Sequence, residues 1–177
     1  NRVAAVSGTV DLPDGTNGLV QVLEFVGGQW MPLGDTIGFL EFNGSSQRSV
    51  FLSGNGNHVA LGSYSSAGSG FGNTRIFELN NGNWELLGSP IYQEQAFDWS
   101  GHAVSLSDNG LTIAIGEPEN SSGVGQVRVF TYDGNDWSQL GSELNGIGVE
   151  TFGKALAISG DGTKLAVGSE NFDLVSN

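Results

Sequence analysis

A tryptophan-led phrase recurs three times along the chain and limits the folds that are open to it. Trp30, Trp84 and Trp137 are 54 and then 53 residues apart, and each opens a five-residue phrase that ends in Leu-Gly. A repeat of this length indicates one supersecondary module stacked on copies of itself. The chain is therefore expected to be a repeat array.

Each copy contains four short runs with strand character. A β-rich run ends in a tight turn, an apolar run follows the turn, a third run begins twelve residues before each Trp, and the Trp phrase is the fourth. The turns lie at 53–56, 107–110 and 159–162, where Asn, Asp and Gly tolerate the positive φ of hairpins. With 29 glycines and no long helical periodicity, the chain is predicted to be all-β.

Four antiparallel strands per unit of about 53 residues are typical of one β-propeller blade. The sequence predicts a single array over 1–177, with a partial blade at 1–37, blades at 49–91 and 103–144, and a partial blade at 154–177. That is thirteen strands, or about three and a quarter blades, whereas closed propellers typically have about four to eight. We therefore expect part of a larger propeller, closed by further repeats of the same polypeptide or by a partner chain.

The segment from Glu150 to Gly168 resembles the FG-GAP repeat, the blade unit of integrin α-subunit propellers. Phe152-Gly153 matches its Phe-Gly step, although the copy at Ser100-Gly101 keeps only the glycine. The resemblance implies a propeller and a calcium loop between the first two strands of each blade.

The loops that match this calcium loop are poor in carboxylates. They hold Asp108 in one copy, Asp161 in another and none in the first, whereas Ca²⁺ prefers several carboxylates among six to eight oxygen ligands. The sequence therefore predicts neither a metal site nor a cofactor. Ca²⁺ is kept as an alternative, although the usual loops are absent.

Charge and composition exclude two kinds of partner. The net charge is -13 with only six Lys and Arg, whereas nucleic-acid binding requires clustered cations. No apolar run approaches the roughly 20 residues of a membrane span. We therefore expect no nucleic acid and no membrane span. Because the chain begins at Asn1, it is expected to be a piece of a longer, processed protein.

No catalytic constellation stands out. There is no cysteine and no Gly-x-Ser-x-Gly elbow. When the copies are aligned, all Lys, Arg and His residues fall at three positions of the repeat, which we call columns. The first column holds Arg48, His102 and Lys154, the second Arg75 and Arg128, and the third Arg2, His58 and Lys164. Residues placed by a repeat are more often architectural, so the sequence predicts no catalytic residue.

Two sets of connections differ in character. Those after the second and fourth strands are long and variable, and binding usually resides in such loops. Seven residues in them are the predicted contacts to a protein or glycan ligand: Asp11, Asp14, Glu94, Asp98, Trp99, Glu117 and Glu119. Trp99 has an alternative role as a substitute for the Phe missing before Gly101. Two Asn-x-Ser sequons in these loops make Asn43 and Asn120 glycosylation candidates.

Together these features predict a non-enzymatic, extracellular or cell-surface propeller module that mediates protein or glycan contacts in an assembly. The alternative is a polysaccharide-active propeller enzyme, a hydrolase or a lyase, with its site at the axis. A fold that hosts many functions keeps this alternative open, and it requires irregular polar residues at the axis ends.

Overall fold

The computed structural model describes residues 1–11, 16–40, 46–65, 72–120, 124–147 and 151–170. Within these ranges the side chains of 5–11, 16–18, 39–40, 46–48 and 65 are not described. The described residues form strands and contain no helix, so the all-β prediction is confirmed. Accordingly, this part of the chain has no helix that is long and apolar enough to cross a membrane.

The described ranges hold sixteen strands. In chain order they are β1 (Arg2–Asp11), β2 (Thr16–Val26), β3 (Gln29–Pro32), β4 (Ile37–Leu40), β5 (Ser46–Leu52), β6 (His58–Ser65), β7 (Asn73–Asn80), β8 (Asn83–Leu86), β9 (Ile91–Tyr92), β10 (Ala103–Leu106), β11 (Thr112–Glu117), β12 (Gln126–Tyr132), β13 (Trp137–Gln139), β14 (Leu144–Asn145), β15 (Ala155–Ile158) and β16 (Leu165–Gly168).

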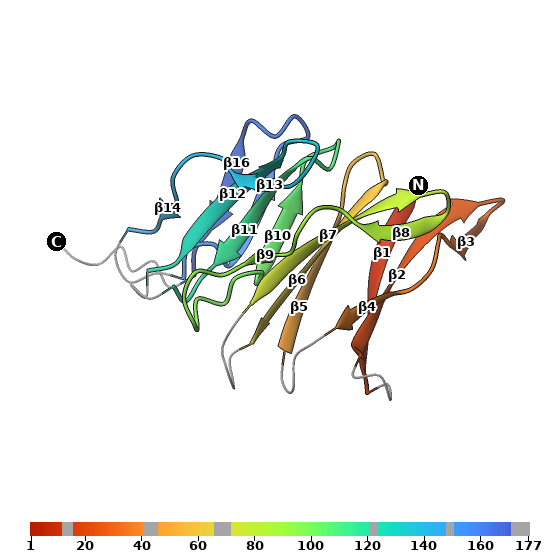
Figure 1. The fold of residues 1–177 in the computed structure, drawn as a ribbon, viewed down its shortest axis with the longest axis horizontal. Coiled ribbons are helices and arrows are strands. Elements are labelled where there is room, and N and C mark those ends of the chain that lie inside the picture. Colours follow the sequence, from red (N-terminus) through yellow and green to blue (C-terminus); the bar gives the residue numbers. More distant parts are fainter. Residues whose placement is uncertain (12–15, 41–45, 66–71, 121–123, 148–150, 171–177) are drawn as a thin grey trace.

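The strands form four antiparallel sheets that follow one another in chain order (Figure 1). Sheet A has the order β1-β2-β3, sheet B β5-β6-β7-β8, sheet C β10-β11-β12-β13 and sheet D β15-β16. Each of the first three sheets has one more short strand, β4, β9 or β14, which pairs with β2, β7 or β12. Sheets A, B and C are therefore meanders of neighbouring strands and sheet D is a hairpin within the described residues, as the tight turns predicted.

The expected fourth strand is broken in two in each copy, and this explains why there are sixteen strands rather than thirteen. Gly34, Gly88 and Gly141, which end the Trp phrases, have φ of +72°, +70° and +77°. This left-handed conformation stops the strand, which resumes two or more residues later on the same neighbour. Residue type alone did not reveal the break.

The hairpin turns between the first two strands of sheets B, C and D share one geometry. In the middle turn, the Thr112 N–H donates to the Ser107 hydroxyl at 3.1 Å and Gly110 has a φ of +75°. Backbone bonds also link successive turns, since the Asn55 N–H donates to Asp108 O at 2.9 Å and the Asp108 N–H to Gly160 O at 2.8 Å. The turns therefore hold sheets B, C and D together at this end.

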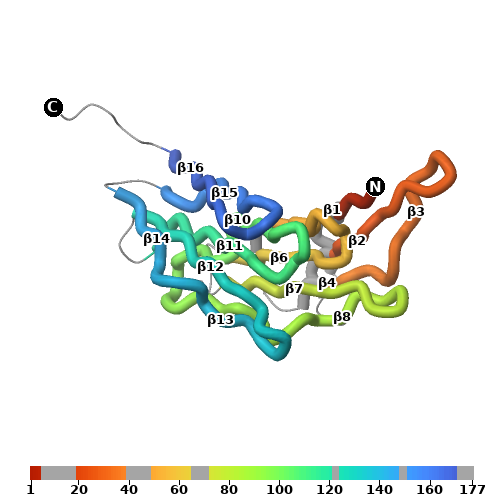
Figure 2. Tube along the Cα trace, turned by 90° about the horizontal axis from the view of Figure 1, so that it is seen from above, coloured from red at the N-terminus to blue at the C-terminus, as the bar shows by residue number. Residues whose placement is uncertain are grey.

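The sheets pack face to face with their first strands adjacent. β5 contacts both β1 and β10, and β10 contacts β15, so the sheets fan out from these first strands (Figure 2). One apolar cluster, which includes Val22, Ile37 and Val59, lies between sheets A and B. Another, which includes Ile76 and Ile113, joins sheets B and C. The sheets do not close into a ring within the described residues.

Candidate functional site

The recurrent tryptophans connect one sheet to the next. The Trp84 indole N–H of sheet B donates to the backbone oxygen of Leu33 in sheet A at 2.8 Å, and Trp137 of sheet C donates to Leu87 O of sheet B at the same distance. A Cβ at Gly34 would lie 2.9 Å from Trp84 Cδ1, so the glycine leaves room for the ring. Trp84 and Trp137 are therefore packing residues between neighbouring sheets.

The column of Arg2 and His58 is also architectural. Arg2 Nη1 donates across the sheet boundary to Gly56 O at 3.0 Å, and its Nε bonds Glu24 within its own sheet at 2.9 Å. His58 lies beneath the Gly110 turn of the next sheet, and its Nε2 lies 3.6 Å from Glu78. Burial is the main influence on His58 and lowers its pKa, against the opposing charge of Glu78.

At the opposite end of the sheets, a buried ion cluster joins sheets B and C. Arg128 is 3% exposed and Glu117 is fully buried, and Arg128 Nε donates to Glu117 Oε1 at 2.9 Å. The same guanidinium reaches Glu94 at 3.4 Å and the backbone oxygen of Tyr92 at 3.1 Å. A buried guanidinium is tolerated because these partners compensate its charge. We call Arg128, Glu117 and Glu94 the Arg128 cluster.

An aromatic stack lies at the same end of the sheets. The Trp99 ring is stacked on Tyr64 of sheet B with centroids 5.5 Å apart, and the His102 ring is 4.7 Å from Tyr64. Trp99 has a φ of +57° and Phe97 a φ of +71°, which bulky residues rarely adopt. Strained backbone of this kind is often found at functional sites. Burial raises the pKa of Tyr64, so its phenol stays protonated at neutral pH.

His102 stands where charged residues of sheets C and D meet. Burial and the adjacent Lys154 ammonium lower its pKa, while hydrogen bonding with the Lys154 backbone and the carboxylates of Glu170 and Glu119 act in the opposite direction. Its Nδ1 is buried and has no hydrogen-bond partner among the described residues. Lys154 Nζ forms an ion pair with Glu170. The imidazole is therefore neutral at pH 7 and able to accept a proton. We call His102, Lys154, Glu119, Glu170 and Trp99 the His102 cluster.

Five of the predicted ligand contacts come together at this end of sheets B and C: Glu94, Asp98, Trp99, Glu117 and Glu119. Asp98 is only 2% exposed and accepts the Gln95 N–H at 3.2 Å, while its backbone oxygen accepts the Glu119 N–H at 3.3 Å. Glu117 and Asp98 therefore stabilise the fold from within, whereas Trp99 is half-buried and Glu119 is exposed.

The other predicted residues do not join this group. Asp11 pairs with Asn17 in sheet A, and its side chain is not among those described. Asp14 and Asn43 lie outside the described residues. Asn120 is 6% exposed and donates to Gln126 Oε1 at 3.0 Å, so its amide is engaged in the folded chain. Glycosylation at either sequon stays a prediction.

The sequence did not single out His102 and Lys154, because both belong to a column of the repeat. Their neighbours lie in the adjacent copy and are not visible in a linear reading. The only available signal was that irregular residues such as Trp99 flank this column in one copy and not in the others. No group of three or more His, Asp or Glu side chains in the described residues could hold a metal ion.

Comparisons with known proteins show little similarity. No family model and no curated protein matches the chain. Among solved structures, the chain is similar to one from Bacteroides fragilis NCTC 9343 described as a candidate 6-phosphogluconolactonase, with 15% identity and a TM-score of 0.43. The match covers 87% of this chain and 58% of that one, so this chain spans little more than half of its length.

Two expectations are corrected by these findings. The FG-GAP assignment is wrong, because no family model matches and the similar structure is of another kind. The glycine of the Phe-Gly step suggested this family, but it recurs because the backbone there is left-handed. Gly101 and Gly153 have φ of +88° and +94°. The non-enzymatic extracellular module is also contradicted, since the similar structure is described as an enzyme. That likeness transfers neither an activity nor a substrate to this chain.

Proposed function

We propose that the chain forms part of a β-propeller enzyme that acts on an anionic polysaccharide, with its site at the axial end occupied by the His102 cluster. The observation that carries this proposal is the position of His102 and Lys154, which precede the adjacent first strands β10 and β15. In a propeller, first strands line the axis. A base and a cation therefore meet at one end of the axis, where we place the substrate.

A lyase fits these two groups best. The neutral imidazole of His102 would take the proton beside the carboxylate of a uronate sugar, and the electron pair would form a carbon–carbon double bond as the glycosidic oxygen leaves with a proton from solvent. The Lys154 ammonium would offset charge that develops on the carboxylate. Trp99, stacked on Tyr64, offers an aromatic surface for a neighbouring sugar ring.

Turnover of polygalacturonate and alginate tests this proposal, with release of unsaturated ends followed by ultraviolet absorbance. We expect turnover with one of these anionic glycans and none with neutral laminarin. His102→Gln should lower the rate at least 100-fold, because general-base catalysis contributes about 10²–10⁴-fold. Lys164→Gln is the matched control, because it removes a cation at the other end of the sheets. Saturated products would indicate a hydrolase, and absence of turnover on all three glycans would refute the proposed activity.

Completion of the propeller by further repeats, or by a partner chain, is part of the same proposal. Trp30 is 47% exposed, and a Cβ at Gly141 would meet nothing within 4 Å, whereas the equivalent residues inside the array are packed together. Sheet D shows the same exposure, since β15 alternates exposed and half-buried residues. An extracellular location suits a polysaccharide substrate. Light scattering on the intact source polypeptide would give the mass and hence the number of repeats.

A further inference from the structure

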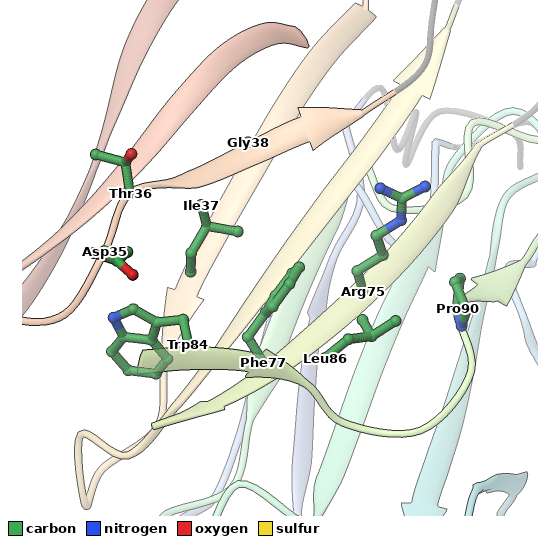
Figure 3. A pocket seen from close by; sticks show the side chains of 9 residues that line it. All are labelled: Asp35, Thr36, Ile37, Gly38, Arg75, Phe77, Trp84, Leu86 and Pro90. Atoms are coloured by element: carbon green, nitrogen blue, oxygen red, sulfur yellow. The ribbon is translucent and has the colours of Figure 1, made fainter. Parts of the chain in front are cut away.

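A pocket separate from the His102 cluster lies between sheets A and B. Its volume is about 550 Å³, within the range of roughly 300–1,000 Å³ of small-molecule sites. Its walls are Ile37 from β4, Phe77 from β7, and Trp84 and Leu86 from β8 (Figure 3). Arg75 from β7 is the cation that lines it. The pocket thus combines an apolar interior with one guanidinium.

Arg75 occupies the same repeat position as Arg128, but it lacks the carboxylates of the Arg128 cluster. The residue that corresponds to Glu117 is Ser63, and the one that corresponds to Glu94 is Leu40. Arg75 Nε is buried without a hydrogen-bond partner in the described part of the chain, whereas Arg128 Nε bonds Glu117. Ser63 is too short to supply the missing acceptor.

We propose that this pocket binds a small monocarboxylate with an apolar or aromatic body. The carboxylate takes the place at the Arg75 guanidinium that Glu94 has at Arg128, where charge-assisted hydrogen bonds are strong. The body lies among Ile37, Phe77 and Trp84. Because Trp84 already donates its indole N–H to Leu33 O, it presents only its ring to the ligand. Asp35 at the pocket wall disfavours a second negative charge.

Calorimetric titration with 3-phenylpropionate and with its neutral analogue 3-phenylpropionamide tests this proposal. We expect the acid to bind and the amide to bind at least tenfold more weakly, since a charge-assisted hydrogen bond contributes about 1.4 kcal/mol or more. Equal affinity of the two compounds, or no binding of the acid at about 10 mM, would overturn the proposal.

Two variants sharpen the test. Arg75→Gln should weaken binding of the acid about tenfold or more without unfolding the chain, because the repeat carries Gln21 at the same position. Ser63→Glu should also weaken it, because the new carboxylate occupies the guanidinium as Glu117 does in sheet C. Lys164→Gln is the control and should leave the affinity unchanged. The proposal fails if either Arg75→Gln or Ser63→Glu binds the acid as tightly as the unchanged chain.

Discussion

The boundary between sheets A and B and the boundary between sheets B and C have the same design but different polar contents. At each, a Trp indole donates to the backbone oxygen of a Leu in the preceding sheet at 2.8 Å, and an apolar cluster fills the space between. Each also has an arginine at the same position of its third strand. Arg128 is enclosed by carboxylates, whereas Arg75 faces a pocket.

The difference between Arg75 and Arg128 shows that the repeat sets where a residue stands and its neighbours set what it does. Arg128 is a buried cross-link because Glu117 and Glu94 surround it. Arg75 keeps unused hydrogen-bonding capacity because Ser63 takes the place of Glu117. Residues at one position of a repeat can therefore belong to the scaffold in one copy and to a binding site in another.

The largest effect is expected from Glu117→Ser. This change places at the boundary between sheets B and C the same residue type, serine, that Ser63 provides between sheets A and B. Removal of one partner of a buried ion pair leaves the other charge uncompensated and typically costs about 3–5 kcal/mol. Urea denaturation should show a loss of this size. Glu94→Leu, at a side chain that is 57% exposed, is the control and should cost under about 1 kcal/mol. Similar losses for the two variants would contradict the cross-link.

A smaller effect should follow from Trp137→Phe and Trp84→Phe. Each change removes the donor to a Leu carbonyl, and loss of such a partner typically costs about 1–3 kcal/mol. Trp30→Phe is the matched control, because Trp30 is 47% exposed, and it should change the free energy of unfolding by about 0.5 kcal/mol or less. If Trp30→Phe cost as much as the others, the indole bonds would not explain the result.

Acid should weaken the boundary between sheets B and C first. His58 and His102 both contact across it, and burial lowers both pKa values from 6.5. Below pH 6.5 the unfolded chain therefore binds more protons than the folded chain. The contribution of the two histidines to the free energy of unfolding is complete above pH 6.5 and is lost as the pH falls below it. Between sheets A and B the matching position holds Arg2 in place of a histidine.

Hydrogen exchange between pH 7 and pH 5 measures this difference. We expect β10 and β11 to lose protection before β1 and β2, and His58→Gln combined with His102→Gln to remove the pH dependence. Equal loss of protection at both boundaries would argue against the assignment to the two histidines.

The smallest effect on stability is expected from Ser63→Glu. The new carboxylate pairs with Arg75, but removing it from water offsets most of the Coulomb energy. The free energy of unfolding should change by no more than about 1 kcal/mol, and a double-mutant cycle with Arg75→Gln should isolate the pair. A cycle with no coupling would show that the introduced carboxylate and the Arg75 guanidinium do not meet.

The sequence by itself determined the repeating strands and the hairpin turns. These features are local or periodic, since turn chemistry and the spacing of Trp30, Trp84 and Trp137 are visible along the chain. The split fourth strand was missed because it depends on the left-handed φ of Gly34 and its counterparts. The FG-GAP assignment failed because a glycine needed for backbone geometry looked like a family signature.

Only the tertiary structure decided which residues act together. His102 and Lys154 share a column yet lie 52 positions apart in the sequence, and they meet because β10 packs beside β15. The contrast between Ser63 and Glu117 could be read from the aligned copies, but its consequence for Arg75 appeared only when strand pairing placed these residues beside the arginines. Side-chain neighbours across sheets depend on register and packing, and neither is encoded within a single repeat.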